Sequence, residues 1–254
     1  MRSPWALGRM PLSSSPQTGR TRPEQEQLPE QFGFSNGRNS VYTSRTMMFA
    51  ELSALFAVCQ SQSSKNEYLS AATDNNALSK KTATTRRRTV QRLTELYALD
   101  RSVTLFRLLT QAWDADAEAR PLLACLCAQA RDPLFRSTTD IVLAVKLGET
   151  LTVEQICEFL ERQHPGRFSI NTRRSAARNL LSSWLQSGYF TGRKRKLRKR
   201  PTVTPTVVAY ALALSALMGR TGQMLFSTPW LRMLAKKDEL NAATRSVPRA
   251  HRSL

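Results

Sequence analysis

The chain has 254 residues, of which 41% are hydrophobic, and its 38 lysines and arginines against 19 aspartates and glutamates give a formal net charge of +19. A chain of this length and composition can bury a real core, and we expect two small domains. Its best apolar run, residues 207–218, is far shorter than the roughly 20 residues of a spanning helix, so we expect no membrane span.

Residues 1–46 differ in composition from the rest of the chain. They are rich in proline, serine, glutamine, glycine and arginine, and they show no sustained apolar period. Such a segment cannot bury enough surface to offset the entropy lost on ordering, so we expect a disordered N-terminal extension. A helical pattern opens directly after Met47 and Met48. This favours a translation start at one of these methionines, which would make the preceding residues non-native; a regulatory tail is the alternative.

Residues 47–133 are expected to form an N-terminal helical domain. Apolar side chains recur at helical spacing from Phe49 to Phe56, and the same spacing predicts helices over 65–73, 85–99 and 104–113. Pro121 suits the first turn of a further helix, and Asp132-Pro133 ends this pattern.

Residues 134–237 are expected to form a second, C-terminal helical domain, with a disordered tail over 238–254. A helix over 138–147 should stop at Gly148. Thr152 and Gln155 have the spacing of a capping box and predict the start of the next helix. A third helix is expected to run through Gln186, capped at its start by Asn171 or Thr172.

Two short β-prone pieces, residues 189–191 and 202–204, flank a basic run after the third helix. Three helices followed by a hairpin with a basic tip is the order of a winged helix-turn-helix. The sequence therefore predicts a mainly α protein with two small helical domains, the second resembling a winged helix-turn-helix with a basic wing. A generic helical bundle with a loose basic loop is the alternative.

Positive charge is concentrated in the second half of the chain. From Arg162 to Lys237 there is no aspartate or glutamate but sixteen lysines and arginines, and seven of the eight residues 193–200 are basic. Self-repulsion makes such clustering costly without an anionic partner. The phosphate backbone of double-stranded DNA is the partner we expect. RNA and an anionic membrane surface are the alternatives, and a solvated loop without a partner is the plainest reading.

A weak internal echo links the two halves. Thr85-Arg86-Arg87 recurs as Thr172-Arg173-Arg174, and in both segments arginines occupy the first turn of a predicted helix. Arginine there opposes the helix dipole, but it becomes useful where a phosphate docks. Coincidence is the alternative to two related DNA-binding units. The candidate DNA-binding residues are Arg86, Arg87, Arg173, Arg174, Arg178, Arg193, Lys194, Arg195, Lys196, Arg198, Lys199 and Arg200.

Several short stretches between residues 47 and 235 carry a family resemblance through their order and spacing. They read Asn-Ala-Leu-Ser-Lys-Lys-Thr at 76–82, Leu-Tyr-Ala-Leu-Asp at 96–100, Arg-Pro-Leu-Leu at 120–123, Ala-Arg-Asp-Pro-Leu at 130–134 and Asn-Leu-Leu-Ser-Ser-Trp at 179–184. In these the chain resembles the BrxA family of bacteriophage-exclusion (BREX) defence systems. The resemblance implies a mostly helical, non-enzymatic accessory protein that binds double-stranded DNA and acts with other BREX proteins.

Enzyme chemistry finds little support in the sequence. The two histidines, His164 and His251, lie far apart, and there is no glycine-rich phosphate loop. The four cysteines lack the spacing of a disulfide framework or a zinc site, so we expect buried thiols and a cytoplasmic protein. We therefore expect no catalytic residue, no metal and no cofactor.

Overall fold

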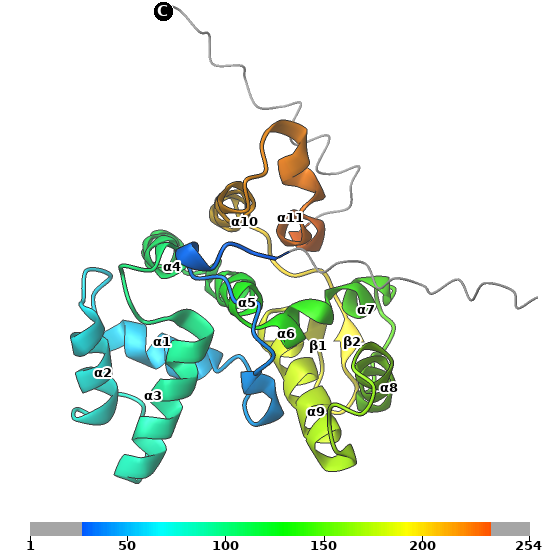
Figure 1. Cartoon of the computed structure of the whole chain (residues 1–254), viewed down its shortest axis with the longest axis horizontal. Coiled ribbons are helices and arrows are strands. Elements are labelled where there is room, and N and C mark those ends of the chain that lie inside the picture. The colour runs from blue at the N-terminus through cyan, green and yellow to red at the C-terminus, as the bar shows by residue number, and fades with distance from the viewer. Residues whose placement is uncertain (1–26, 235–254) are drawn as a thin grey trace, which may run out of the picture.

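A computed structural model describes residues 27–234. Within this range the chain forms eleven α-helices, three short 3-10 helices and one two-stranded sheet, which confirms the prediction of a mainly α protein (Figure 1). The first half contains η1 (Glu30–Phe32), η2 (Val41–Thr43), α1 (Phe49–Val58), α2 (Lys65–Thr73), α3 (Ala83–Tyr97), α4 (Thr104–Ala115) and α5 (Arg120–Arg131). The second half contains α6 (Pro133–Ser137), α7 (Thr139–Ala144), α8 (Val153–Gln163), α9 (Ile170–Gln186), β1 (Phe190–Thr191), β2 (Leu197–Arg198), α10 (Pro205–Leu217), η3 (Gly222–Ser227) and α11 (Pro229–Leu234).

Side-chain caps fix the beginnings of most helices. The predicted capping box is present at α8, where Thr152 and Gln155 satisfy each other's backbone N–H groups. Helix α9 begins earlier than expected, because its N-cap is Ser169 rather than Asn171 or Thr172, and the Ser169 hydroxyl accepts from the Thr172 backbone N–H at 3.2 Å. The helix expected over 138–147 is shorter: α7 ends at Ala144, and the chain turns extended at Val145.

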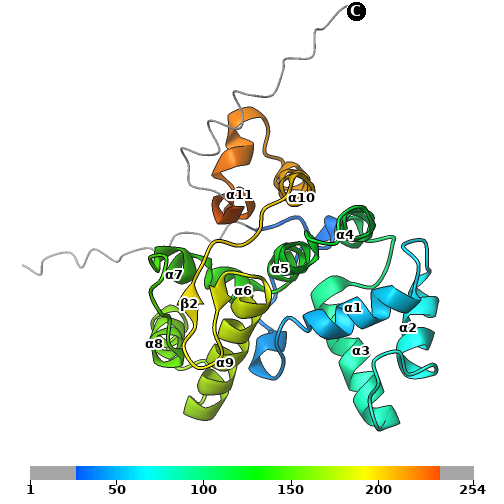
Figure 2. The ribbon, with the colours of Figure 1, turned by 180° about the vertical axis from the view of Figure 1, so that it is seen from behind.

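Helix α5 is the centre of the fold. Every residue from Leu122 to Ala130 is buried, and α3, α4, α6, α9 and α10 all contact this helix. Its alanines and cysteines are small enough to let helices approach from all sides. Figures 1 and 2 show α1–α3 on one side of α5 and α6–α9 on the other, with α10 and α11 above α5 in both views.

The predicted division after residue 133 does not separate two cores. The buried apolar residues from Leu28 to Leu234 form one continuous cluster. Helix α10, which we assigned to the C-terminal domain, packs against α4 and α5, and the Tyr210 hydroxyl donates to the Leu105 carbonyl at 3.3 Å. The two-domain prediction is therefore corrected to two helical units that share a central helix.

The segment 27–46, predicted to be disordered, is also corrected. Tyr42 is fully buried, with its ring centroid 4.6 Å from that of Phe135. The Val41 backbone N–H donates to the Asp132 carboxylate at 3.0 Å, and the Asn179 side chain donates to the Tyr42 carbonyl at 2.8 Å. This segment thus joins α5 to α9. The predicted disorder of residues 1–26 and the tail 238–254 lies outside the described residues.

No helix within residues 27–234 combines the length and apolar character needed to cross a membrane.

Candidate nucleic-acid interface

The basic run of the sequence forms a tight hairpin after α9. Strands β1 and β2 pair antiparallel, with Phe190 opposite Arg198 and Thr191 opposite Leu197. The return strand therefore lies inside the basic run, and the piece 202–204 predicted as a strand is not one. Thr204 instead caps α10, where its hydroxyl accepts from the Val207 backbone N–H at 3.4 Å.

The hairpin tip depends on glycine and on one lysine. Gly192 has a φ of +95°, and a Cβ there would lie 2.2 Å from the Arg195 carbonyl oxygen, so only glycine fits. The Lys196 ammonium donates to the carbonyls of Gly192 and Arg193, at 3.1 and 2.9 Å, and so closes the loop. The other tip cations, Arg193, Lys194 and Arg195, remain exposed to solvent.

A third extended segment, missed in the sequence, pairs with the hairpin. Thr150 forms an antiparallel bridge with Leu197. The Gly148 N–H donates to the Arg198 carbonyl at 2.9 Å, and the Arg198 N–H donates to the Glu149 carbonyl at 2.8 Å. Strand β2 therefore lies between residues 148–150 and β1. The segment is too short to show an alternating pattern, and the sequence offered Gly148 only as a helix stop.

Arg198, a candidate DNA-binding residue, is buried and structural. Only 8% of its surface is exposed, and its guanidinium lies over the Tyr189 ring at 4.7 Å from the centroid. It donates to the carbonyls of Val142 and Tyr189, at 3.3 and 3.2 Å, and to that of Lys199. Burial lowers its pKa, and Tyr189 partly offsets this shift. This side chain fastens the hairpin to α7 and is removed from the set of DNA-binding candidates.

Replacement of Arg198 by alanine is expected to destabilise the protein by about 2 to 4 kcal/mol. The change removes charged donors from buried carbonyls together with the stacked contact on Tyr189. Lys199→Ala is the matched control, because the neighbouring Lys199 side chain is exposed and its loss should cost less than about 0.5 kcal/mol. Thermal melting measures both, and equal melting temperatures would contradict the structural role of Arg198.

Helix α9 presents a mixed outward face beside the hairpin. Arg174 and Arg178 are exposed one turn apart, together with Ile170, Asn171 and Ser175, none of which we had predicted as site residues. Arg173 forms an ion pair with Glu161 of α8 and is largely shielded, so it contributes less to this face than predicted. Arg174 lies 4.0 Å from Glu154, a weak contact between two exposed side chains.

A second basic face lies at the start of α3. Arg87 and Arg88 are exposed and Arg86 is half-buried. Arg88 was not among the predicted site residues, although it continues the same arginine run. Figures 1 and 2 both show α3 and α9 starting at the same end of the molecule, on opposite sides of α5.

The internal echo has a structural counterpart. Leu93 and Leu180 are both fully buried, and so are the aromatic side chains of Tyr97 and Trp184 one turn later. In each helix the arginines of the first turns stand before a buried apolar stripe. The two basic faces therefore occupy equivalent positions on their helices.

The chain matches no protein-family model and no curated protein sequence. The functional argument therefore rests on the positions of the basic residues and on the fold that holds them.

Proposed function

We propose that this chain is a non-enzymatic protein that binds double-stranded DNA through a winged helix-turn-helix. The observation that carries the proposal is the position of β2 between the segment 148–150 and β1. Helix α7, this segment, α8, α9 and the hairpin follow one another in the order of that motif. In the motif the third helix enters the major groove and the wing lies on the flanking backbone.

The exposed charges have the distribution that such docking needs. Arg193, Lys194 and Arg195 project from the tip of the proposed wing, and Arg174 and Arg178 lie on the outward face of the proposed recognition helix. Arginine can contact phosphates or donate two hydrogen bonds to guanine in the major groove. The wing would supply affinity that does not depend on sequence, and α9 would supply base contacts.

The face of α3 supports a second contact with the same duplex. Arg87 and Arg88 lie at the end of the molecule where α9 also starts, so both helices can approach one partner (Figure 2). Two contacts on one duplex raise affinity because the second becomes intramolecular.

A place in a bacteriophage-exclusion system is the biological setting we propose, on the resemblance to the BrxA family. The stretches that carry the resemblance lie largely in the core: Asp132 caps α6 and holds Ser40 and Val41, and Trp184 is fully buried. These stretches therefore support a shared fold more than a shared binding surface. Other BREX proteins are therefore proposed partners, to be sought by co-purification.

A mobility-shift titration with duplex DNA, single-stranded DNA and duplex RNA across a salt series tests the proposal. We expect the tightest binding to duplex DNA, weakening steeply as salt rises, because bound counterions are released on binding. Tighter binding to duplex RNA would favour the alternative of an RNA-binding protein. Absence of binding to duplex DNA at low salt would refute the proposed function.

Replacing the three exposed tip cations, Arg193, Lys194 and Arg195, with alanine should weaken duplex binding and flatten its dependence on salt. Loss of three phosphate contacts should reduce the log–log slope by about 3 units. Lys196 is left in place because it closes the tip. The control combines Lys65→Ala with Arg232→Ala, two cations already paired with Asp100 and Asp140. An unchanged slope in the tip variant would remove the wing from the interface.

Single substitutions on α9 should show which of its arginines contact DNA. Arg174→Ala and Arg178→Ala are each expected to weaken duplex binding by about 1 to 3 kcal/mol, the usual cost of a lost base contact. Arg173→Ala should weaken binding less, because that guanidinium is paired with Glu161. Circular dichroism checks that the helices persist. Normal binding by both of the first two variants would mean that α9 does not enter the groove.

A further inference from the structure

A polar cleft of about 990 Å³ lies where the N-terminal segment meets α3 and the loop before α9. It is separate from the hairpin and from the outward face of α9. Two of its lining residues are apolar, Val41 and Phe168, and the rest are polar, charged or glycine. The lining comprises Ser35, Gly37, Arg38, Asn39, Ser40, Val41, Thr43, Arg92, Glu95, Arg131, Asp132, Arg167 and Phe168.

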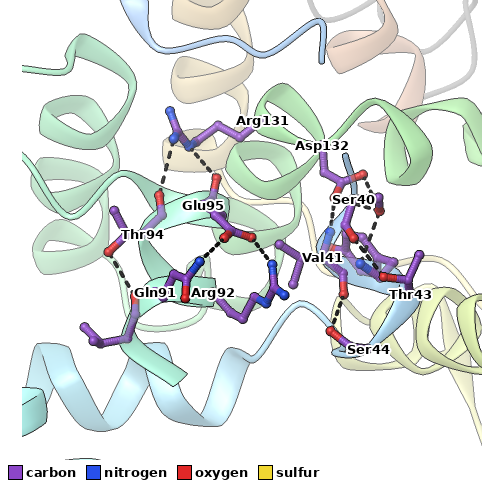
Figure 3. A network of polar contacts seen from close by, with 12 residues as sticks. Ser40, Val41, Thr43, Ser44, Gln91, Arg92, Thr94, Glu95, Arg131 and Asp132 are labelled. Carbon is purple, nitrogen blue, oxygen red and sulfur yellow. Dashed lines mark hydrogen bonds and ion pairs between the residues drawn. The ribbon is translucent and has the colours of Figure 1, made fainter. Parts of the chain in front are cut away.

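Both carboxylates that line the cleft are committed to neighbours (Figure 3). Asp132 accepts from the Ser40 hydroxyl at 2.9 Å and from the backbone N–H groups of Val41, Leu134 and Phe135 at 3.0 to 3.1 Å. Glu95 accepts from Arg92 at 2.6 Å and from Gln91 at 3.1 Å. The lining nevertheless has four arginines against these two carboxylates, a formal excess of two positive charges.

The four lining arginines differ in what they contact. Arg131 donates to the carbonyls of Gly33, Glu95 and Thr94, at 2.6, 3.0 and 3.3 Å, and Arg92 is paired with Glu95. Arg38 and Arg167, by contrast, form no ion pair with any carboxylate of the described chain. Arginine is over-represented where phosphate is recognised through bidentate hydrogen bonds, and these two guanidiniums have no carboxylate occupying their donors.

Arg167 is held in place for such a role. Its guanidinium lies over the Phe168 ring, 4.7 Å from the centroid, and donates to the Arg38 carbonyl. Burial lowers the pKa of Arg167, Asp132 partly offsets this shift, and the nearby Arg38 guanidinium lowers the pKa further. Both arginines line the same cleft, and an anion bound there would offset the repulsion between their like charges.

We propose that this cleft binds a phosphate group between the guanidiniums of Arg38 and Arg167. Guanidinium groups match the tetrahedral oxygens of phosphate through paired, charge-assisted hydrogen bonds. The cleft is much larger than one phosphate ion, so it has room for a nucleotide or for a strand of nucleic acid. The proposal of a phosphate site is independent of the wing and of α9, and it does not require that either of them binds DNA.

Calorimetric titration with inorganic phosphate and with ATP, beside duplex-DNA titration, tests the site in the full chain. The variants are Arg38→Ala and Arg167→Ala. Arg38 is the cleaner of the two, because its side chain is exposed and the contact to Arg167 uses its backbone carbonyl. Arg45→Ala is the matched control, an exposed arginine of the same segment that does not line the cleft. Thermal melting checks folding.

Loss of about tenfold or more in affinity for phosphate or ATP in Arg38→Ala, with Arg45→Ala unchanged, would support a site for a free phosphate compound. If neither small titrant binds, a similar loss in duplex affinity in both cleft variants would support a nucleic-acid phosphate as the occupant. If wild-type protein binds neither small titrant, and duplex affinity is absent or equal in Arg38→Ala and Arg45→Ala, the cleft does not bind phosphate. Failure of duplex binding alone would refute the proposed function and leave the small-titrant result to decide this site.

Discussion

A chain that starts at Met47 is expected to be unfolded or aggregated. The truncation removes Leu28, Phe34, Val41 and Tyr42, all of which are buried in the common core. Each large apolar side chain contributes about 1.5 to 3 kcal/mol through burial, so the sum approaches the whole stability of a typical protein of about 5 to 15 kcal/mol. The buried Asp132 carboxylate would also lose two of its donors, Ser40 and Val41.

Removal of residues 1–26 alone is the matched control, because every contact named above stays in place. Circular dichroism and thermal melting of the two truncated chains, beside the full chain, measure the difference. If the chain from Met47 melted at the same temperature as the full chain, the N-terminal segment would add nothing to the core. Such a result would favour the hypothesis that translation starts at Met47 or Met48.

The sequence predicted the helices well where one apolar face repeats over several turns. Helix α2 has the predicted bounds, α4 begins as predicted and ends two residues later, and the capping box of α8 is present. The order of the segment 27–46 was not predicted, because its only regular elements are two short 3-10 helices and these give no repeating apolar face. Its buried residues follow no period, and they are ordered by partners such as Asp132 and Asn179, far away in the chain.

The candidate site shows a similar limit. The sequence located the concentration of positive charge. It could not distinguish a solvent-exposed side chain from one that is bound to a carbonyl or carboxylate of the protein. Arg198 is committed because the carbonyl of Val142 lies beside it in space, and Arg173 is committed to Glu161 on the neighbouring helix. Such partners are set by the packing of α7, α8 and the hairpin. Only the exposed subset of the predicted residues therefore remains available to a partner.

Trp184→Ala is expected to destabilise the protein by about 3 to 5 kcal/mol, the usual cost of truncating a buried aromatic side chain. Trp184 is fully buried, and its ring packs against Phe135 and Tyr189 at centroid distances of 5.1 and 4.9 Å. The indole N–H donates to the Thr138 hydroxyl at 2.9 Å. Tyr189 also lies under the Arg198 guanidinium, so a cavity at Trp184 should loosen the hairpin as well as the helix.

Trp184→Phe separates packing from the hydrogen bond at this position. It keeps an aromatic ring and loses the indole N–H, so it should cost clearly less than the alanine variant, about 1 to 2 kcal/mol. Chemical denaturation of both variants gives the free energies of unfolding, and duplex titration gives their affinities. A core tryptophan loses stability first and binding only as a consequence, whereas a tryptophan that stacks on nucleic acid would lose binding alone. A Trp184→Ala protein with normal unfolding free energy and no duplex affinity would contradict the buried position of this side chain and reverse the assignment of the outward face of α9.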